Sequence, residues 1–139
     1  YCDLSPATSQ VIPSLCVKAL SSLSDEKILN IWGNGNQGRA FIHAKEVVFA
    51  IKNSIIKGEN KGVIQIGPEK CTAINDIAKI IIKNLDSNLK INYDSSKPTG
   101  DIGRRANFEK ATKLLGWKPY IPIEDGIKDL LDWIITKNR

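Results

Sequence analysis

The sequence predicts an α/β fold built from mixed short strands and about five helices. Short apolar stretches with period-two patterning alternate along the chain with segments whose apolar residues recur every three or four positions. Such alternation is typical of α/β proteins in which at least some strands pair in parallel. The 139 residues, 42% hydrophobic and 25% charged, match the usual size and composition of one globular domain. We therefore expect a single domain over residues 1–139.

The first part of the chain predicts a helix and a strand. Ser9 is placed to cap a helix over residues 11–20, in which Pro13 is tolerated because it lies near the first turn. The stretch "KILNIW" (27–32) alternates apolar and polar residues. It predicts a strand that ends at Gly33.

A second strand and a longer helix are expected next. "RAFIHA" (39–44) is the candidate strand, and it leads into a helix over residues 44–57 that Gly58 is placed to end. The apolar residues at helical spacing in this segment are Val47, Val48, Ile51 and Ile55.

The second half of the chain alternates in the same way. "GVIQIG" (62–67) and "LKINYD" (89–94) predict strands, and Thr72 can cap the helix that lies between them. A short helix over residues 107–115 ends before Gly116. A final helix carries apolar residues at a spacing near 3.6, namely Ile123, Ile127, Leu130, Leu131 and Ile134.

Charge and cysteine content argue against several classes of protein. The net charge of +5 comes from scattered Lys and Arg residues without interleaved aromatic residues, so a solvated surface explains it better than a nucleic-acid partner. Cys2, Cys16 and Cys71 lack metal-ligand spacing and fit free thiols in a reducing compartment. No apolar run approaches the roughly 20 residues of a membrane span. We expect a cytoplasmic protein without a metal site or a membrane partner.

Little in the sequence points to catalysis. The single histidine, His43, has no nucleophile at a motif spacing, and such a histidine is more often a core group than a base. The letters G-x-G-x-x-G occur at Gly33, Gly35 and Gly38. A dinucleotide-binding loop must open a helix, however, and strand-like "RAFIHA" follows here. We expect neither a catalytic residue nor a cofactor site in this chain.

Two arginines are better candidates for a binding site. Arg39 follows a glycine turn and Arg104 follows the turn-rich loop "KPTGDIG", so both are expected at the ends of elements, where binding residues concentrate. A guanidinium can grip a diphosphate through two parallel hydrogen bonds. Pairing of each arginine with a surface carboxylate is the alternative, and the residues alone leave both interpretations open.

Four stretches in order cover nearly the whole chain: "SQVIPSLCVKAL", "IWGNGNQGRAFIHAKEVVFAI", "VIQIGPEKCTAINDIAKII" and "KPTGDIGRRANFEKATKLLGWKPYIPIEDGIKDLLDWI". The second is the most specific and is similar to W-G-x-G-x-Q-x-R-x-F-I-[HY]-V-x-D. Together the stretches resemble the C-terminal part of the NAD(P)-dependent nucleotide-sugar epimerases and dehydratases of the extended short-chain dehydrogenase/reductase family. This resemblance implies the C-terminal portion of a Rossmann-type fold.

The resemblance also implies substrate-binding residues, which are Val11, Lys18, Trp32, Gly35, Arg39 and Arg104. The two arginines would hold the diphosphate of a nucleotide sugar. Val11 and Lys18 would lie near the nucleotide, and Trp32 with Gly35 would line its pocket. "SQVIP" and "IWG" look most like enzymes of GDP-sugar metabolism, so a GDP-sugar is the favoured substrate.

The chain also departs from the family pattern. The acidic residue expected after "FIHV" falls at Lys45 or Glu46, the Asp of G-R-x-x-D is Asn107, and N-I-G has become "QIG" at Gln65. The family's glycine-rich NAD(P) loop and its catalytic Tyr-x-x-x-Lys pair lie upstream of the stretches matched here. In the family, the region from "FIH" to "NIG" commonly packs on the cofactor domain. We therefore expect one of two arrangements for Val47, Val48, Ile51 and Ile55. An oligomer contact covers them, or they form an exposed apolar patch.

These implications lead to one expected function and two alternatives. We expect the nucleotide-sugar-binding portion of an NAD(P)-dependent epimerase or dehydratase, an isomerase or lyase that is silent without its N-terminal cofactor domain, where NAD or NADP would bind. The first alternative is a stand-alone, non-catalytic sugar-nucleotide-binding module, which the departures at Lys45, Gln65 and Asn107 favour. A basic nucleic-acid-binding domain ranks last because it rests on charge alone. Assembly into a homo-oligomer is left open.

Overall fold

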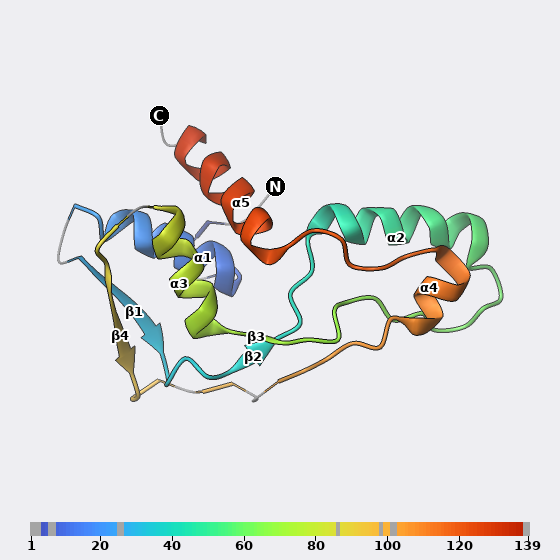
Figure 1. The fold of residues 1–139 in the computed structure, drawn as a ribbon, viewed down its shortest axis with the longest axis horizontal. Coiled ribbons are helices and arrows are strands. Elements are labelled where there is room, and N and C mark those ends of the chain that lie inside the picture. The colour runs from blue at the N-terminus through green and yellow to red at the C-terminus, as the bar shows by residue number, and fades with distance from the viewer. Residues whose placement is uncertain are drawn as a thin grey trace. The chain divides into compact units, whose positions relative to one another are not determined.

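A computed structural model of the chain describes residues 4–5, 8–24, 27–85, 87–97, 99–100 and 103–137. Over these residues, five helices and four short strands alternate, which confirms the expected α/β class (Figure 1). No helix in this part of the chain is long and apolar enough to cross a bilayer.

The chain divides into two compact units. Unit 1 comprises Tyr1–Gln37, Ala73–Gly100 and Glu124–Arg139, and unit 2 comprises Gly38–Thr72 and Asp101–Ile123. That residues 1–139 form a single substrate-binding domain stays a prediction.

Unit 1 contains a two-stranded parallel sheet with helices packed on it. β1 (Ile28–Trp32) and β4 (Lys90–Asp94) pair along their whole length, with Ile28 opposite Lys90 and Trp32 opposite Asp94. α1 (Val11–Ser21) and α3 (Ile74–Asn84) pack on each other and on β1 (Figure 1). α5 (Ile123–Lys137) buries one apolar stripe, formed by Ile127, Leu131 and Ile134. These elements bear out the strands predicted from "KILNIW" and "LKINYD".

The two predicted helix caps in unit 1 are wrong by one residue. Gln10 rather than Ser9 is the N-cap of α1, and Ala73 rather than Thr72 is the N-cap of α3. Neither N-cap side chain makes a capping hydrogen bond. At α3 the reason is visible, because the first backbone N–H groups, of Ile74 and Asn75, donate instead to carbonyl oxygens of the glycine turn at 3.0 and 2.9 Å.

Unit 2 is built around α2 (Ala44–Lys57) and α4 (Glu109–Leu115), which pack on each other. Its buried centre is Ala50, Ala111, Leu115 and Trp117, with Ile42, Ile64, Ile66, Phe108 and Leu114 packed around it. The Phe108 and Trp117 rings meet edge to face, with centroids 5.8 Å apart. The predicted bounds of α2 and its end at Gly58 are confirmed.

The strands predicted in unit 2 are short or absent among the described residues. β2 covers only Gly38–Arg39 and pairs with β3 (Thr72–Ala73) in a second two-stranded sheet. The rest of "RAFIHA" is not a strand, because His43 already serves as the N-cap of α2. Residues 61–66 form no strand, since a strand needs a neighbouring one and the structure describes none beside this segment. Their alternation persists in burial: Val63 is 89% exposed, whereas Ile64 and Ile66 contact the buried centre.

The start of α2 is held by two local hydrogen bonds. The His43 Nδ1 atom accepts from the backbone N–H of Lys45 at 3.1 Å, and the Glu46 carboxylate accepts from the backbone N–H of His43 at 3.0 Å. This reciprocal arrangement is a capping box. His43 is therefore a half-buried helix cap rather than the core residue that the sequence suggested.

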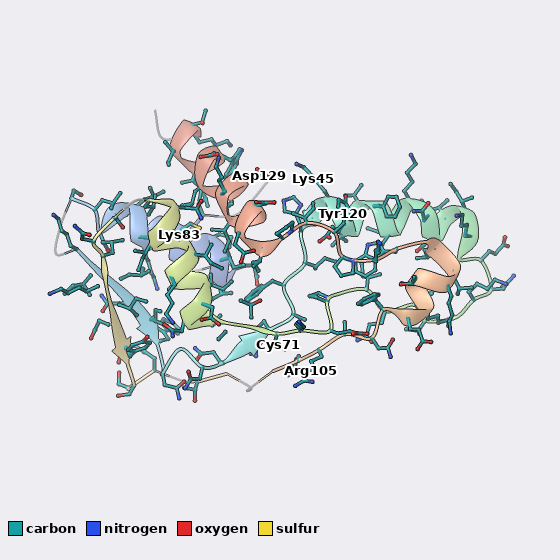
Figure 2. All side chains as sticks on the ribbon, in the orientation of Figure 1. Lys45, Cys71, Lys83, Arg105, Tyr120 and Asp129 are labelled. Atoms are coloured by element: carbon teal, nitrogen blue, oxygen red, sulfur yellow. The ribbon has the colours of Figure 1, made fainter. Side chains whose placement is uncertain are left out.

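The same carboxylate also binds the segment that follows α4. Glu46 is 1% exposed, and its Oε1 atom accepts from the backbone N–H groups of Tyr120 and Ile121 at 2.5 and 2.9 Å. The indole Nε1 of Trp117 donates to the Glu46 carbonyl oxygen at 2.9 Å. Figure 2 labels Lys45 and Tyr120, which lie at this junction. One residue thus joins two segments that are about seventy positions apart in the sequence.

Replacing Glu46 with alanine is expected to lower the free energy of unfolding by about 3 kcal/mol, because several backbone N–H groups lose a charged acceptor. Urea denaturation followed by far-UV circular dichroism measures this change. Glu69→Ala, which removes an exposed carboxylate from the same unit, is the matched control and should change the value by less than about 0.5 kcal/mol. Equal effects of the two substitutions would contradict the role given to Glu46.

Candidate functional site

The six residues implied by the family resemblance fall into two groups. Val11, Lys18, Trp32 and Gly35 belong to unit 1, whereas Arg39 and Arg104 belong to unit 2. Each group has its own local geometry.

An exposed indole ring is the main feature of the group in unit 1. Trp32 is the last residue of β1 and is 55% exposed. The Lys18 Nζ atom, from α1, lies 5.5 Å from the ring centroid, and the Lys97 Nζ atom lies 5.9 Å from it. Both distances are within the reach of a cation–π contact. Val11, in the first turn of α1, is 38% exposed.

Lys97 is a further candidate residue, which the sequence analysis missed. It follows β4, and the parallel register places the end of β4 beside the end of β1, with Asp94 opposite Trp32. The signal that finds it is topological. Parallel strands end at the same edge of a sheet, so the loops after them are neighbours.

The glycine turn after Trp32 is packed tightly against other parts of unit 1. Gly35 has a φ of +76°, and a Cβ atom there would lie 2.9 Å from the ring of Tyr93. Its carbonyl oxygen accepts from the backbone N–H of Asn75 at 2.9 Å. The Tyr93 hydroxyl in turn donates to the Asn75 side-chain oxygen at 2.7 Å. The turn therefore requires glycine at position 35 and has a fixed position beside Trp32.

The loop that carries Lys97 is fixed in a similar way. The Asp94 carboxylate accepts from the hydroxyl and the backbone N–H of Ser96 at 2.5 and 3.1 Å. These bonds, with the side-chain bond of Ser96 contributing most, and the nearby charge of Lys97 lower the pKa of the Asp94 carboxyl below its usual value. The Asp94 carbonyl oxygen accepts from the backbone N–H groups of Gly33 and Lys97 at 2.8 and 3.2 Å. The glycine turn and the Lys97 loop are thus bonded to the same residue.

The two arginines of unit 2 are connected through the segment that leads into β3. Arg39 lies in β2, is half-buried, and donates from Nη1 to the Gly38 carbonyl oxygen at 2.8 Å. β2 pairs with β3, which begins at Thr72. The preceding Cys71 thiol donates to the carbonyl oxygen of Arg104 at 3.1 Å (Cys71 is labelled in Figure 2). This short chain of contacts brings the backbones of both arginines to one part of unit 2.

Two of the departures from the family pattern have structural roles. The Gln65 side-chain oxygen accepts from the backbone N–H of Asn107 at 3.1 Å, and the Asn107 side-chain oxygen accepts from the backbone N–H of Glu109 at 2.9 Å. The Lys110 ammonium donates to the carbonyl oxygens of Lys61 and Val63 at 2.6 and 2.8 Å. These bonds fix the start of α4 against residues 61–65.

The glycine turn does not have the geometry of a dinucleotide-binding loop. The turn from Gly33 to Gly38 joins β1 to the short strand β2 and not to a helix, so it lacks the strand–turn–helix geometry that receives a pyrophosphate. Among the described residues, no group of three His, Cys, Asp or Glu side chains is placed to hold a metal.

The letters Tyr-x-x-x-Lys do occur once, at Tyr93 and Lys97, which the sequence analysis overlooked. The two residues do not share a helix face, because Tyr93 lies in β4 and Lys97 in the following loop. Their side chains have separate partners: the Tyr93 hydroxyl bonds to Asn75, and the Lys97 ammonium lies at the Trp32 ring.

Known proteins similar to this chain are enzymes that act on nucleotide sugars. No family profile matches the sequence. The chain is 33% identical over 131 residues to the dTDP-D-glucose 4,6-dehydratase of Mus musculus. The match covers 89% of this chain and 36% of the dehydratase. The chain is 30% identical over 126 residues to a trifunctional UDP-glucose 4,6-dehydratase/UDP-4-keto-6-deoxy-D-glucose 3,5-epimerase/UDP-4-keto-L-rhamnose-reductase of Arabidopsis thaliana. This match covers 89% of this chain and 18% of that protein.

Solved structures agree with these sequence relatives. A UDP-glucuronic acid 4-epimerase from Bacillus cereus, in complex with UDP-glucuronic acid and NAD, aligns with a TM-score of 0.80 and 25% identity over 92% of this chain and 40% of its own. A GDP-L-fucose synthetase from Naegleria fowleri shares the fold, with a TM-score of 0.89 at 17% identity over 99% of this chain and 42% of its own. The chain spans well under half the length of each. These relatives and structural neighbours are NAD(P)-dependent nucleotide-sugar epimerases and dehydratases of the extended short-chain dehydrogenase/reductase family, and this chain matches a C-terminal portion of them.

Proposed function

We propose that this chain is the portion of an NAD(P)-dependent nucleotide-sugar epimerase or dehydratase that binds the nucleotide sugar. The observation that carries the proposal is the arrangement of Arg39 and Arg104 in unit 2, joined through Cys71 and Thr72. Two guanidinium groups at the ends of neighbouring segments suit a diphosphate, which accepts several charge-assisted hydrogen bonds. Trp32, Lys18, Val11 and Gly35 would receive the nucleoside, and a GDP-sugar stays the favoured substrate.

The role assigned to this portion is positioning rather than chemistry. Holding the diphosphate fixes where the sugar ring lies, and correct placement of a reacting group is a large part of enzymatic rate acceleration. NAD or NADP would be bound by the N-terminal cofactor domain of the intact enzyme, because the described glycine turn of this chain does not open a helix. We accordingly propose that this portion is catalytically silent by itself, and that the enzyme works in the cytoplasm.

The cofactor domain is also the proposed partner of an apolar surface on unit 2. Val48, Ile51 and Ile55 form a stripe on α2 and are 64%, 55% and 79% exposed, whereas Val47, which was expected with them, is half-buried. After α2, residues 61–66 keep the alternation of a strand without a described neighbour, and Val63 is almost fully exposed. A helix with a bare apolar stripe followed by an unpaired strand-like segment suits packing on a sheet. Contact with a second copy of the chain is the alternative.

Removing both candidate phosphate ligands tests the substrate site. The double substitution Arg39→Ala, Arg104→Ala is expected to weaken binding of UDP-glucose, dTDP-glucose or GDP-mannose by about 3 kcal/mol, a factor of about 100, because two charge-assisted contacts are lost. Isothermal titration calorimetry measures the affinity. Arg105→Ala removes an exposed neighbouring charge and should change it by less than threefold, a small effect of a surface charge. Equal losses in both variants would contradict the proposal.

Substitutions in the exposed stripe on α2 are expected to change what its surface binds but not the stability of the chain. The double substitution Ile51→Asp, Ile55→Asp is expected to reduce binding of a hydrophobic dye and self-association, yet to change the free energy of unfolding by less than about 0.5 kcal/mol, because both side chains are exposed. Ala50→Asp, at a 2% exposed position of the same helix, should destabilise unit 2 strongly. Comparable destabilisation by both changes would show that the stripe belongs to the core of this chain.

A further inference from the structure

The Arg104 loop (residues 103–107) lies along an earlier stretch of unit 2, the bracing segment (residues 65–71). We propose that the bracing segment positions the Arg104 guanidinium for the diphosphate of the substrate, with Cys71 and Gly67 as positioning residues. This inference rests on the proposed function and adds to it the residues that set where one phosphate ligand lies.

Hydrogen bonds join the two segments along their length. The Cys71 thiol donates to the Arg104 carbonyl oxygen at 3.1 Å. Further along the loop, the Ala106 backbone N–H donates to the Pro68 carbonyl oxygen at 3.3 Å. The Gln65 side-chain oxygen accepts from the backbone N–H of the last loop residue at 3.1 Å. The partners occur in opposite order in the two segments, which therefore run antiparallel.

Two glycines allow a close approach between the segments. Gly67 is buried and has a φ of +139°, and a Cβ atom there would lie 2.9 Å from the Cβ atom of Ala106. A Cβ atom at Gly103 would lie 3.2 Å from the Cys71 sulfur. Both distances are shorter than an ordinary van der Waals contact, so a side chain at either position would push the segments apart. The lack of a side chain at both glycines therefore helps to set the position of the Arg104 loop.

These contacts act on the backbone that bears the guanidinium. The Cys71 thiol bonds to the carbonyl oxygen of Arg104 itself, so a shift of the bracing segment moves the base of this side chain. A guanidinium grips a phosphate through directed, parallel hydrogen bonds, and small displacements weaken such contacts. Cys71 is followed by Thr72, which begins β3, and β3 pairs with the strand that holds Arg39. The bracing segment is thus connected to the backbones of both arginines.

Substitutions of Cys71 test this positioning role. Cys71→Ser keeps a hydrogen-bond donor of similar size beside the Arg104 carbonyl oxygen, whereas Cys71→Ala removes the donor. Calorimetry with UDP-glucose is expected to show about fivefold weaker binding for Cys71→Ala, the effect of one lost hydrogen bond, and a change of less than about twofold for Cys71→Ser. Circular dichroism should show the same fold in both variants, because Cys71 is only half-buried.

Repeating the comparison without the Arg104 guanidinium separates positioning from a general structural role. In a chain with Arg104→Ala, Cys71→Ala is expected to change the affinity for UDP-glucose by less than about twofold, because the group that Cys71 positions is gone. In a chain with Arg39→Ala, the loss of about fivefold should persist. A purely structural effect of Cys71→Ala would appear equally in both backgrounds.

Two glycines of unit 2 supply an independent test. Gly67 and Gly116 both have positive φ angles, so alanine strains the backbone at either position. Only at Gly67 does the new methyl group meet another segment, since nothing lies within 4 Å of a Cβ atom at Gly116. Gly67→Ala is expected to weaken UDP-glucose binding about tenfold, and Gly116→Ala by less than about twofold, at a temperature where both variants are folded.

Three results would each overturn this inference alone, in a chain whose binding still depends on Arg39 and Arg104. They are no effect of Cys71→Ala, an equal effect of Cys71→Ala with and without Arg104, and equal effects of Gly67→Ala and Gly116→Ala. Absence of UDP-glucose binding in a folded chain, or binding that Arg104→Ala leaves unchanged, would overturn the proposed function as well. A loss of affinity in Cys71→Ala that depends on Arg104 supports the inference.

Discussion

The buried carboxylate of Glu46 is the constraint on which unit 2 depends. It completes the cap of α2 and also accepts from the backbone after α4, while its own carbonyl oxygen receives the Trp117 indole. Burying a charge is costly unless its hydrogen bonds are satisfied, and here three backbone N–H groups satisfy it. Because α2 follows directly from the segment that contains β2, this network also limits where Arg39 can lie. The role of the Glu46 carboxylate in this structure is thus architectural.

The two units have different tasks in the proposed function. Unit 1 offers an exposed aromatic ring with flanking ammonium groups at the shared end of two parallel strands, a surface suited to a base. Unit 2 offers two arginines on connected segments, which suit a diphosphate, and an exposed apolar stripe on α2. Gln65 and Asn107, where the sequence departs from the family pattern, take part in hydrogen bonds that fix the start of α4. These two departures therefore affect the architecture of unit 2.

Local pattern was sufficient for the elements that depend on local interactions. The bounds of α2 follow from helical spacing and from Gly58. β1 and β4 follow from the alternation of apolar and polar residues in two stretches that pair with each other. "GVIQIG" has the same alternation but forms no strand among the described residues, because strand pairing is a property of two segments and a sequence shows only one. Lys97 was missed for a related reason: its place beside Trp32 depends on the register of β1 and β4 rather than on its sequence neighbours. Arg39 and Arg104 became candidates because glycine turns and guanidinium chemistry are both visible in the sequence, and their role in binding stays a prediction.

The proposed function depends most on Arg39 and Arg104 of unit 2, which would hold the diphosphate of a nucleotide sugar. A nuclear magnetic resonance titration with UDP-glucose, observing indole and guanidinium N–H signals, tests this role. The signals of Arg39 and Arg104 are expected to shift together and to saturate with one dissociation constant, while the indole signal of Trp133 on α5 stays unchanged. Shifts that never saturate, or that affect only one of the two arginines, would contradict the role.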